Sequence, residues 1–100
     1  MTGEKIAGAL GFAARAGKIT VGTHLVLEQV QKEKAAAVLF ACDAGRDAER
    51  KITLPAERQN IPVKRIGLTK KELARVIGKS GEAVCVAIPQ EFLNLVLASL

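Results

Sequence analysis

The chain has 100 residues, 49% of them hydrophobic, which is enough to bury the core of one domain and excludes a disordered chain. Fifteen Lys and Arg residues against ten Asp and Glu residues give a net charge of +5, and no apolar run is long enough to span a bilayer. Residues 1–20 carry charges instead of a signal-peptide pattern, at Glu4, Lys5, Arg15 and Lys18. We therefore expect a cytoplasmic protein that does not enter a membrane.

The first predicted element is a helix that Thr2 can cap. Its apolar residues recur on one face at helical spacing, at Ile6, Leu10, Ala13 and Ala14. Gly17 stands where a residue in the left-handed conformation would end this helix. The extended run Lys18–Val21 then predicts a short strand.

A second helix is predicted from Thr23 to about Glu33, with Gly22 or Thr23 as its N-cap. We expect it to bury Leu25, Val26 and Val30. The N–H groups at its start would lie unpaired beside the cationic Lys18, and such a helix end attracts anions, usually phosphate. An ordinary turn between a strand and a helix is the alternative interpretation of this stretch.

The middle of the chain contains an unbroken apolar run, Ala36–Cys42, which is typical of a central strand covered on both faces. Asp43 follows it and is a natural N-cap for the charged segment Arg46–Asn60. Pro55 lacks a backbone N–H group, so we expect that segment to break or kink near Thr53–Pro55.

The second half repeats this alternation of helix and strand. Ile61–Gly67 predicts a strand with Pro62 at its start, where a missing donor does least harm. Thr69–Glu72 has the pattern of a capping box and begins a helix that runs to about Ile77. Gly78–Gly81 is then predicted to be a loop.

A second buried strand is predicted at Ala83–Ile88. Pro89 suits the first position of a last helix. The apolar stripe of that helix consists of Phe92, Leu93, Val96, Leu97 and Leu100. Five helices and four strands predict an α/β fold, a single-domain three-layer α/β/α sandwich with a four-stranded mixed sheet. Ala36–Cys42 and Ala83–Ile88 should be its neighbouring central strands.

The two cysteines, Cys42 and Cys85, each lie within an apolar run and are expected to be reduced and buried. The chain has one His and no Cys-x-x-Cys pattern, so neither a zinc site nor a Cys–His nucleophile pair is supported. No paired carboxylates lie in a suggestive place, and no Ser-His-Asp order is visible in the sequence. We expect no enzymatic activity and no cofactor.

The basic residues are unevenly distributed along the chain. Between residues 58 and 79 the one acid, Glu72, accompanies seven bases: Arg58, Lys64, Arg65, Lys70, Lys71, Arg75 and Lys79. A one-sided basic face is typical of a nucleic-acid-binding protein, although a solvated surface that keeps the protein soluble is the alternative. The sequence has no Trp or Tyr, so aromatic platforms for single-stranded bases are not expected.

Four strings of residues, in this order and at this spacing, are similar to those of a known family. They are Leu10–Lys18, Val21–Thr23, Val38–Ala44 and Ala74–Lys79. The chain resembles the kink-turn-binding ribosomal protein superfamily (L-seven-Ae and L-thirty-e), and within it the bacterial YlxQ-type branch, encoded among translation genes. The resemblance extends over nearly the whole chain.

This resemblance implies the same sandwich and a non-catalytic RNA-binding protein of the translation apparatus. Its candidate partners are structured RNA, ribosomal or containing a kink-turn, and the ribosome itself. No metal, cofactor or membrane is implied. A protein–protein interaction module of the same apparatus, in which the Leu25 side of the helix start docks a partner, is the alternative.

The family builds its RNA site from the start of the second helix and the loop before the last strand, and this site grips the sheared G·A pairs of a kink-turn. Carried onto this chain, the helix positions are Gly22, Thr23, His24, Leu25 and Glu28. The loop positions are Ile77, Gly78, Lys79, Ser80 and Gly81, with the segment from Asp43 to Arg46 beside them.

The resemblance also implies roles for these residues. The N–H groups at Gly22 and Thr23 would hold phosphate, Lys18 and Lys79 would supply charge, and His24 would read or stack on a base. Kink-turn binders carry Asn or Lys where His24 stands, Glu or Gln where Leu25 stands, and Lys where Glu28 stands. Leu25 cannot hydrogen-bond a guanine edge, and Glu28 would face the phosphates with the wrong sign.

Overall fold

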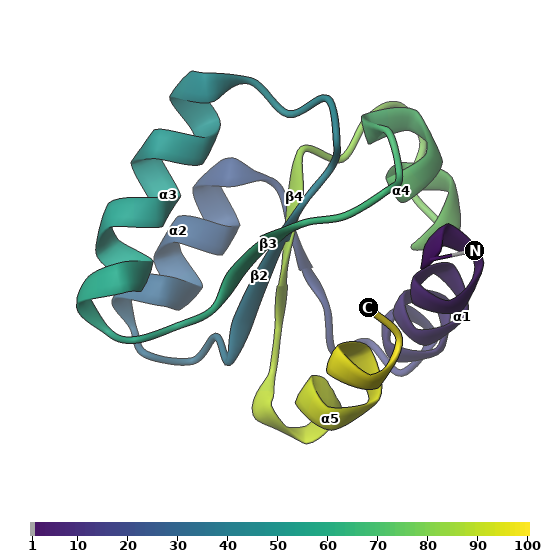
Figure 1. Cartoon of the computed structure of the whole chain (residues 1–100), viewed down its shortest axis with the longest axis horizontal. Coiled ribbons are helices and arrows are strands. Elements are labelled where there is room, and N and C mark those ends of the chain that lie inside the picture. The colour runs from purple at the N-terminus through teal and green to yellow at the C-terminus, as the bar shows by residue number, and fades with distance from the viewer. Residues whose placement is uncertain (1) are drawn as a thin grey trace.

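The computed structural model describes residues 2–100, with side chains from Lys5 onward, so the predicted cap by Thr2 lies outside the described side chains. Helices and strands alternate along this part of the chain, in the predicted order (Figure 1). The elements are α1 (Thr2–Arg15), β1 (Thr20–Val21), α2 (Thr23–Gln31), β2 (Ala37–Phe40), α3 (Arg46–Arg58), β3 (Val63–Arg65), α4 (Lys70–Val76), β4 (Cys85–Ile88) and α5 (Gln90–Ala98).

The four strands form one mixed sheet in the order β1-β4-β2-β3. β2 and β4 pair in antiparallel orientation, with Ala37 opposite Ile88 and Phe40 opposite Cys85. β3 runs parallel to β2 on one edge, and β1 runs antiparallel to β4 on the other. Every residue of β2 and β4 is buried. The prediction that these two apolar runs form the neighbouring central strands is therefore confirmed.

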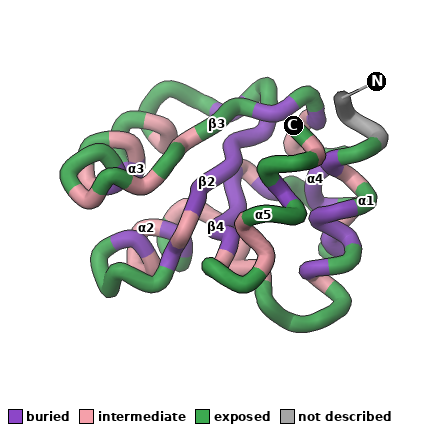
Figure 2. Tube along the Cα trace, turned by 60° about the horizontal axis from the view of Figure 1, so that its bottom comes forward, coloured by how far each residue is buried: buried purple, intermediate pink, exposed green. Residues whose placement is uncertain are grey.

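Alternate residues of the central strands enter two cores, one on each face of the sheet. Figure 2 shows β2 and β4 as buried strands with α2 and α3 on one side and α1, α4 and α5 on the other. The first core joins the sheet to α1, α4 and α5 through Leu39, Val86, Ile6, Leu10, Leu73 and Val96. The second core joins the sheet to α2 and α3 through Phe40, Cys85, Val26, Val30, Ile52 and Ala56. Two helix layers enclose one sheet, so the predicted three-layer α/β/α sandwich is confirmed.

The predicted break at Pro55 is wrong, because α3 continues through this residue. A proline inside a helix removes one backbone hydrogen bond and costs about 3 kcal/mol. Ile52 and Ala56, on either side of it, are fully buried in the second core. Burial of an Ile side chain alone contributes about 1.5–3 kcal/mol, so tertiary packing holds the helix together across the proline.

Most element boundaries lie one or two residues inside the predicted ones. The predicted strand Lys18–Val21 narrows to the two residues of β1, and Ala36–Cys42 narrows to Ala37–Phe40. Gly17 has a φ of 72° and adopts the expected left-handed conformation. Pro89 is the N-cap of α5, one position before the first helical residue. In residues 2–100 no helix combines the length and apolar character that crossing a bilayer requires.

Candidate nucleic-acid interface

Three segments that are distant in sequence meet at one end of the sheet, where β1 and β2 finish and β4 begins. The N–H group of Gly22 donates to the carbonyl oxygen of Cys85 at 3.0 Å, which places the start of α2 against the start of β4. The N–H group of Ala41 donates to the carbonyl oxygen of Val84 at 2.9 Å, which places the turn after β2 on the other side of the start of β4. We call this region the loop end of the sheet.

The start of α2 presents backbone donors at the loop end. Gly22 is the N-cap, and no side chain caps this helix start. Because the N–H group of Gly22 is bound to Cys85, it is not free for phosphate, and this part of the prediction is corrected. The N–H groups of the first three helical residues, Thr23, His24 and Leu25, have no hydrogen-bond partner within the described part of the chain.

The side chains of this helix start differ in exposure. His24 is exposed, and Leu25 is 50% exposed, so the prediction that Leu25 is buried is wrong. Glu28 is half-buried and forms an ion pair with Lys32 one turn later, at 3.4 Å. The neighbouring cation offsets part of the negative charge that Glu28 would otherwise present to phosphate groups.

Asp43, in the turn after β2, caps a different helix from the one predicted. The N-cap of α3 is Gly45, in an extended conformation. The Oδ1 atom of Asp43 accepts a hydrogen bond from the N–H group of Lys70 at 2.8 Å, at the start of α4. Thr69 and Glu72 complete the predicted capping box there, so its prediction is confirmed. Asp43 thus links the turn after β2 to α4.

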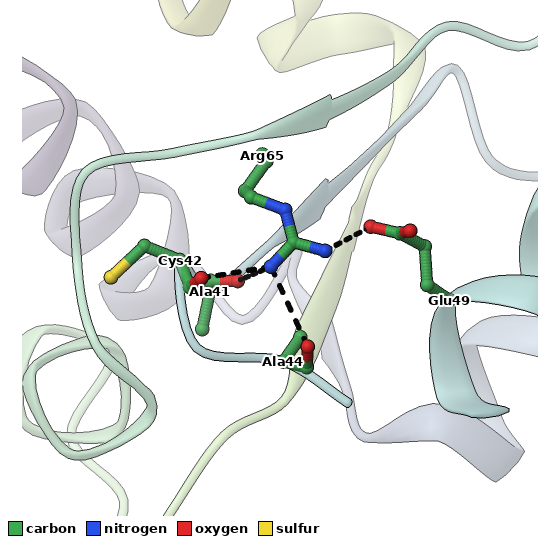
Figure 3. A network of polar contacts seen from close by, with 5 residues as sticks. All are labelled: Ala41, Cys42, Ala44, Glu49 and Arg65. Carbon is green, nitrogen blue, oxygen red and sulfur yellow. Dashed lines mark hydrogen bonds and ion pairs between the residues drawn. The ribbon is translucent and has the colours of Figure 1, made fainter. Parts of the chain in front are cut away.

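Arg65, at the end of β3, holds the turn after β2 in place (Figure 3). Its guanidinium donates to the carbonyl oxygens of Cys42 at 2.8 Å, Ala41 at 3.3 Å and Ala44 at 3.5 Å. It also pairs with the carboxylate of Glu49 on α3. The sequence identifies Arg65 only as one of the surface bases, because no sequence pattern indicates its contacts with the turn after β2 or with Glu49.

The predicted loop positions follow the end of α4. Gly78, with a φ of 78°, ends the helix, and the N–H group of Lys79 donates to the carbonyl oxygen of Ala74 at 2.8 Å. Lys79 and Ser80 are exposed, whereas Ile77 is 7% exposed and belongs to the first core. The chain then returns to the loop end, where Ala83 donates to the carbonyl oxygen of Lys70.

Lys18 lies away from the loop end. It precedes β1, and its ammonium is 3.6 Å from the carboxylate of Glu91 in the first turn of α5. α5 follows the carboxyl end of β4, whereas Gly22 contacts the amino end of that strand. The structure therefore does not bring Lys18 beside the start of α2. Arg46, in contrast, is exposed at the start of α3, directly after the turn that Arg65 holds.

The cysteines differ from each other in their surroundings. Cys85 is buried as predicted, and this burial raises the pKa of its thiol to about 12, although contact with the Thr23 hydroxyl acts in the opposite direction. Cys42 is exposed, so its predicted burial is wrong. The apolar run continues through Cys42, but strand pairing ends at Phe40 and the chain turns outward. Neither thiol is in a disulfide.

We predict that one thiol of the native protein reacts quickly with a chromogenic disulfide at pH 8 and that the other does not. A pKa of about 12 keeps Cys85 protonated at this pH, and burial excludes the reagent. The Cys42→Ser variant should lose the fast phase, and both thiols of the wild type should react in guanidinium. A fast phase that persists in this variant would contradict the burial of Cys85.

Among the residues that the structure describes, no three His, Cys, Asp or Glu side chains gather closely enough to hold a metal ion. What the loop end offers is a set of backbone donors, the exposed imidazole of His24 and, at the start of α3, the exposed Arg46. These groups suit an anionic ligand that also carries hydrogen-bonding edges.

Comparisons with known proteins found one matching family and similar sequences. Residues 4–95 match the model of the Ribosomal protein L7Ae/L30e/S12e/Gadd45 family. The chain is 31% identical over 91 residues to the RNA-binding protein YlxQ of Bacillus subtilis, covering 91% of this chain and 90% of that one.

Two solved structures have a similar fold. One is a protein of unknown function from Bacillus halodurans, with a TM-score of 0.87, 31% identity and 95% coverage of both chains. The other is the 15.5kD RNA-binding protein of Giardia lamblia, with a TM-score of 0.81 and 24% identity, covering 98% of this chain and 83% of that one.

Proposed function

The chain belongs to the Ribosomal protein L7Ae/L30e/S12e/Gadd45 family, and we propose that it acts as one non-catalytic RNA-binding domain in the cytoplasm. One observation carries this proposal: the unpaired N–H groups at the start of α2 lie at the same end of the sheet as the turn after β2 and the start of β4. Family membership favours RNA binding over the protein-docking alternative.

We further propose that the ligand is structured RNA with tandem G·A pairs, as in a kink-turn of ribosomal RNA. The N–H groups of Thr23, His24 and Leu25 would hold a phosphate group, because a helix N-terminus is a general anion site. The exposed imidazole of His24 would contact a base edge. Lys79 and Arg46 would contact the phosphate backbone on either side.

The experiment that tests this proposal is a filter-binding titration of an RNA containing tandem G·A pairs, repeated at several salt concentrations. We expect Lys79→Ala to reduce the slope of log affinity against log salt by about one counterion. Lys34→Ala is the matched control, because Lys34 is exposed in the connection between α2 and β2, at the opposite end of the sheet. The absence of salt-dependent binding by the wild type would overturn the proposal.

A further inference from the structure

The structure accounts for only some of the bases between Arg58 and Lys79. Arg65 is bound to the turn after β2 and to Glu49. Lys70 is 3.8 Å from the carboxylate of Glu82. Neither Lys71 nor Arg75, both exposed on α4, has an ion-pair partner among the described side chains. The same holds for Arg58, Lys64 and Lys79, but of these three only Lys79 lies beside Lys71 and Arg75.

Lys71 and Arg75 are four residues apart on α4 and therefore lie on the same face of this helix. Together with Lys79 they line a hollow of about 290 Å³ whose remaining walls are Gly81 and Glu82. We call the three cations the basic ridge. The nearest carboxylates are already engaged, since Glu72 belongs to the capping box and Glu82 pairs with Lys70.

Like charges at this spacing weaken a helix, and neither Lys71 nor Arg75 lies within ion-pair distance of an acid among the described side chains. An anion seated between the three side chains would relieve the repulsion. The hollow is open and contains no aromatic or large apolar side chain, so it does not suit a small ligand that must be enclosed. A row of cations on an open surface suits a polyanion instead.

The basic ridge is continuous with the proposed RNA site, and this continuity favours RNA as the polyanion. Lys79 belongs to the loop that leads back to β4 and carries the proposed RNA-contact positions, and it also closes the basic ridge. α4 covers the opposite face of the sheet from α2 (Figure 1). With about 10 Å between adjacent layers, α4 with Lys71 and Arg75 is separated from α2 by about 20 Å, so one ligand must be extended to reach both helices.

We propose that Lys71, Arg75 and Lys79 hold the phosphodiester backbone of an RNA stem that continues from the segment bound at the start of α2. This inference rests on the proposed function and deepens it, because it assigns α4 a second, sequence-independent contact. An RNA that contains only the internal loop would reach Lys79 but not Lys71 and Arg75, whereas one with a longer stem on that side would reach all three.

The test compares two RNAs with the same internal loop, one with minimal stems and one with a stem extended by a full helical turn. The variant is Lys71→Gln with Arg75→Gln, which leaves Lys79 in place. The matched control is Lys51→Gln with Arg58→Gln, which also removes one Lys and one Arg, both exposed on α3 in the other helix layer. Wild type and both variants are titrated at several salt concentrations.

We expect the ridge variant to bind the long RNA about tenfold more weakly at low salt, with a salt slope lower by about two counterions. Its binding of the short RNA should be unchanged, and the control should match the wild type on both RNAs. Thermal unfolding should show the ridge variant at least as stable as the wild type, because the substitution removes a repulsive pair.

Three outcomes would overturn the ridge and leave the proposed function standing. In the first, the ridge variant binds the long RNA like the wild type. In the second, it loses affinity equally for both RNAs, as the overall charge alone would cause. In the third, the variant loses binding to polyglutamate while it keeps binding to the long RNA, which would assign the ridge to an acidic protein. A wild type that binds neither RNA would overturn the proposed function itself.

Discussion

Replacement of Gly22 by alanine is expected to lower the free energy of unfolding by about 1–3 kcal/mol. Gly22 has φ 95° and ψ 151°, a combination that essentially only glycine adopts. A Cβ atom added there would meet no atom within 4 Å, so the whole cost arises in the backbone. Relaxation of this strain would also shift the unpaired N–H groups of the first turn of α2, and RNA affinity should fall.

Gly45→Ala is the matched control for this prediction. Gly45 is also a helix N-cap with open space around its Cβ position, but its φ of −71° suits any residue. We expect this substitution to cost less than about 1 kcal/mol, since alanine is only a poorer cap than glycine. Urea denaturation of the three proteins measures both effects. Equal destabilisation by the two substitutions would show that Gly22 has no special backbone conformation.

The double variant Leu25→Gln with Glu28→Lys should discriminate between an RNA with tandem G·A pairs and a plain duplex more strongly than the wild type does. The difference in binding free energy between the two RNAs should grow by about 1–3 kcal/mol, the value of one good base contact. Leu25 is half exposed at the start of α2, so glutamine can be accommodated and can hydrogen-bond a guanine edge. Replacement of Glu28 removes a carboxylate and adds the cation that kink-turn binders carry there. Gel-shift titrations of both RNAs provide the measurement.

Glu28→Lys alone separates charge from base recognition in this experiment. It should strengthen binding of both RNAs to the same extent, because phosphate contacts carry no sequence information. It also replaces the ion pair between Glu28 and Lys32 by two like charges four residues apart, which should cost about 0.4–1 kcal/mol of stability, the sum of the lost attraction and the added repulsion. If the double variant shows the same preference as Glu28→Lys, then the start of α2 is not the surface that reads bases.

The layers of the fold could be predicted from the sequence because they depend on local patterns. The runs around Val38 and Val86 are apolar at every position, and only a strand covered on both faces accommodates such a run. The capping box at Thr69 likewise involves residues only three apart. Pro55 shows the limit of this reasoning, because its effect on the helix depends on core residues supplied by other elements.

The candidate site was less predictable because its geometry depends on contacts between distant residues. Asp43 has the sequence context of a cap for the helix that follows it, yet its partner, Lys70, is 27 residues away. Lys18 is four residues from Gly22 in sequence, but the intervening strand places the two at opposite ends of β4. Charge and residue type identify the candidates, and only the sheet register determines which of them meet.

The two edges of the sheet bear on how the protein behaves at high concentration. An open strand edge can pair with another chain and so begin aggregation. Here β1 has only two residues, and β3 has three, of which Lys64 and Arg65 are exposed and charged. Short edges and charged edges are two of the features by which natural sheets avoid such pairing. Neither side of this sheet therefore offers a template on which copies of the chain could join into fibrils.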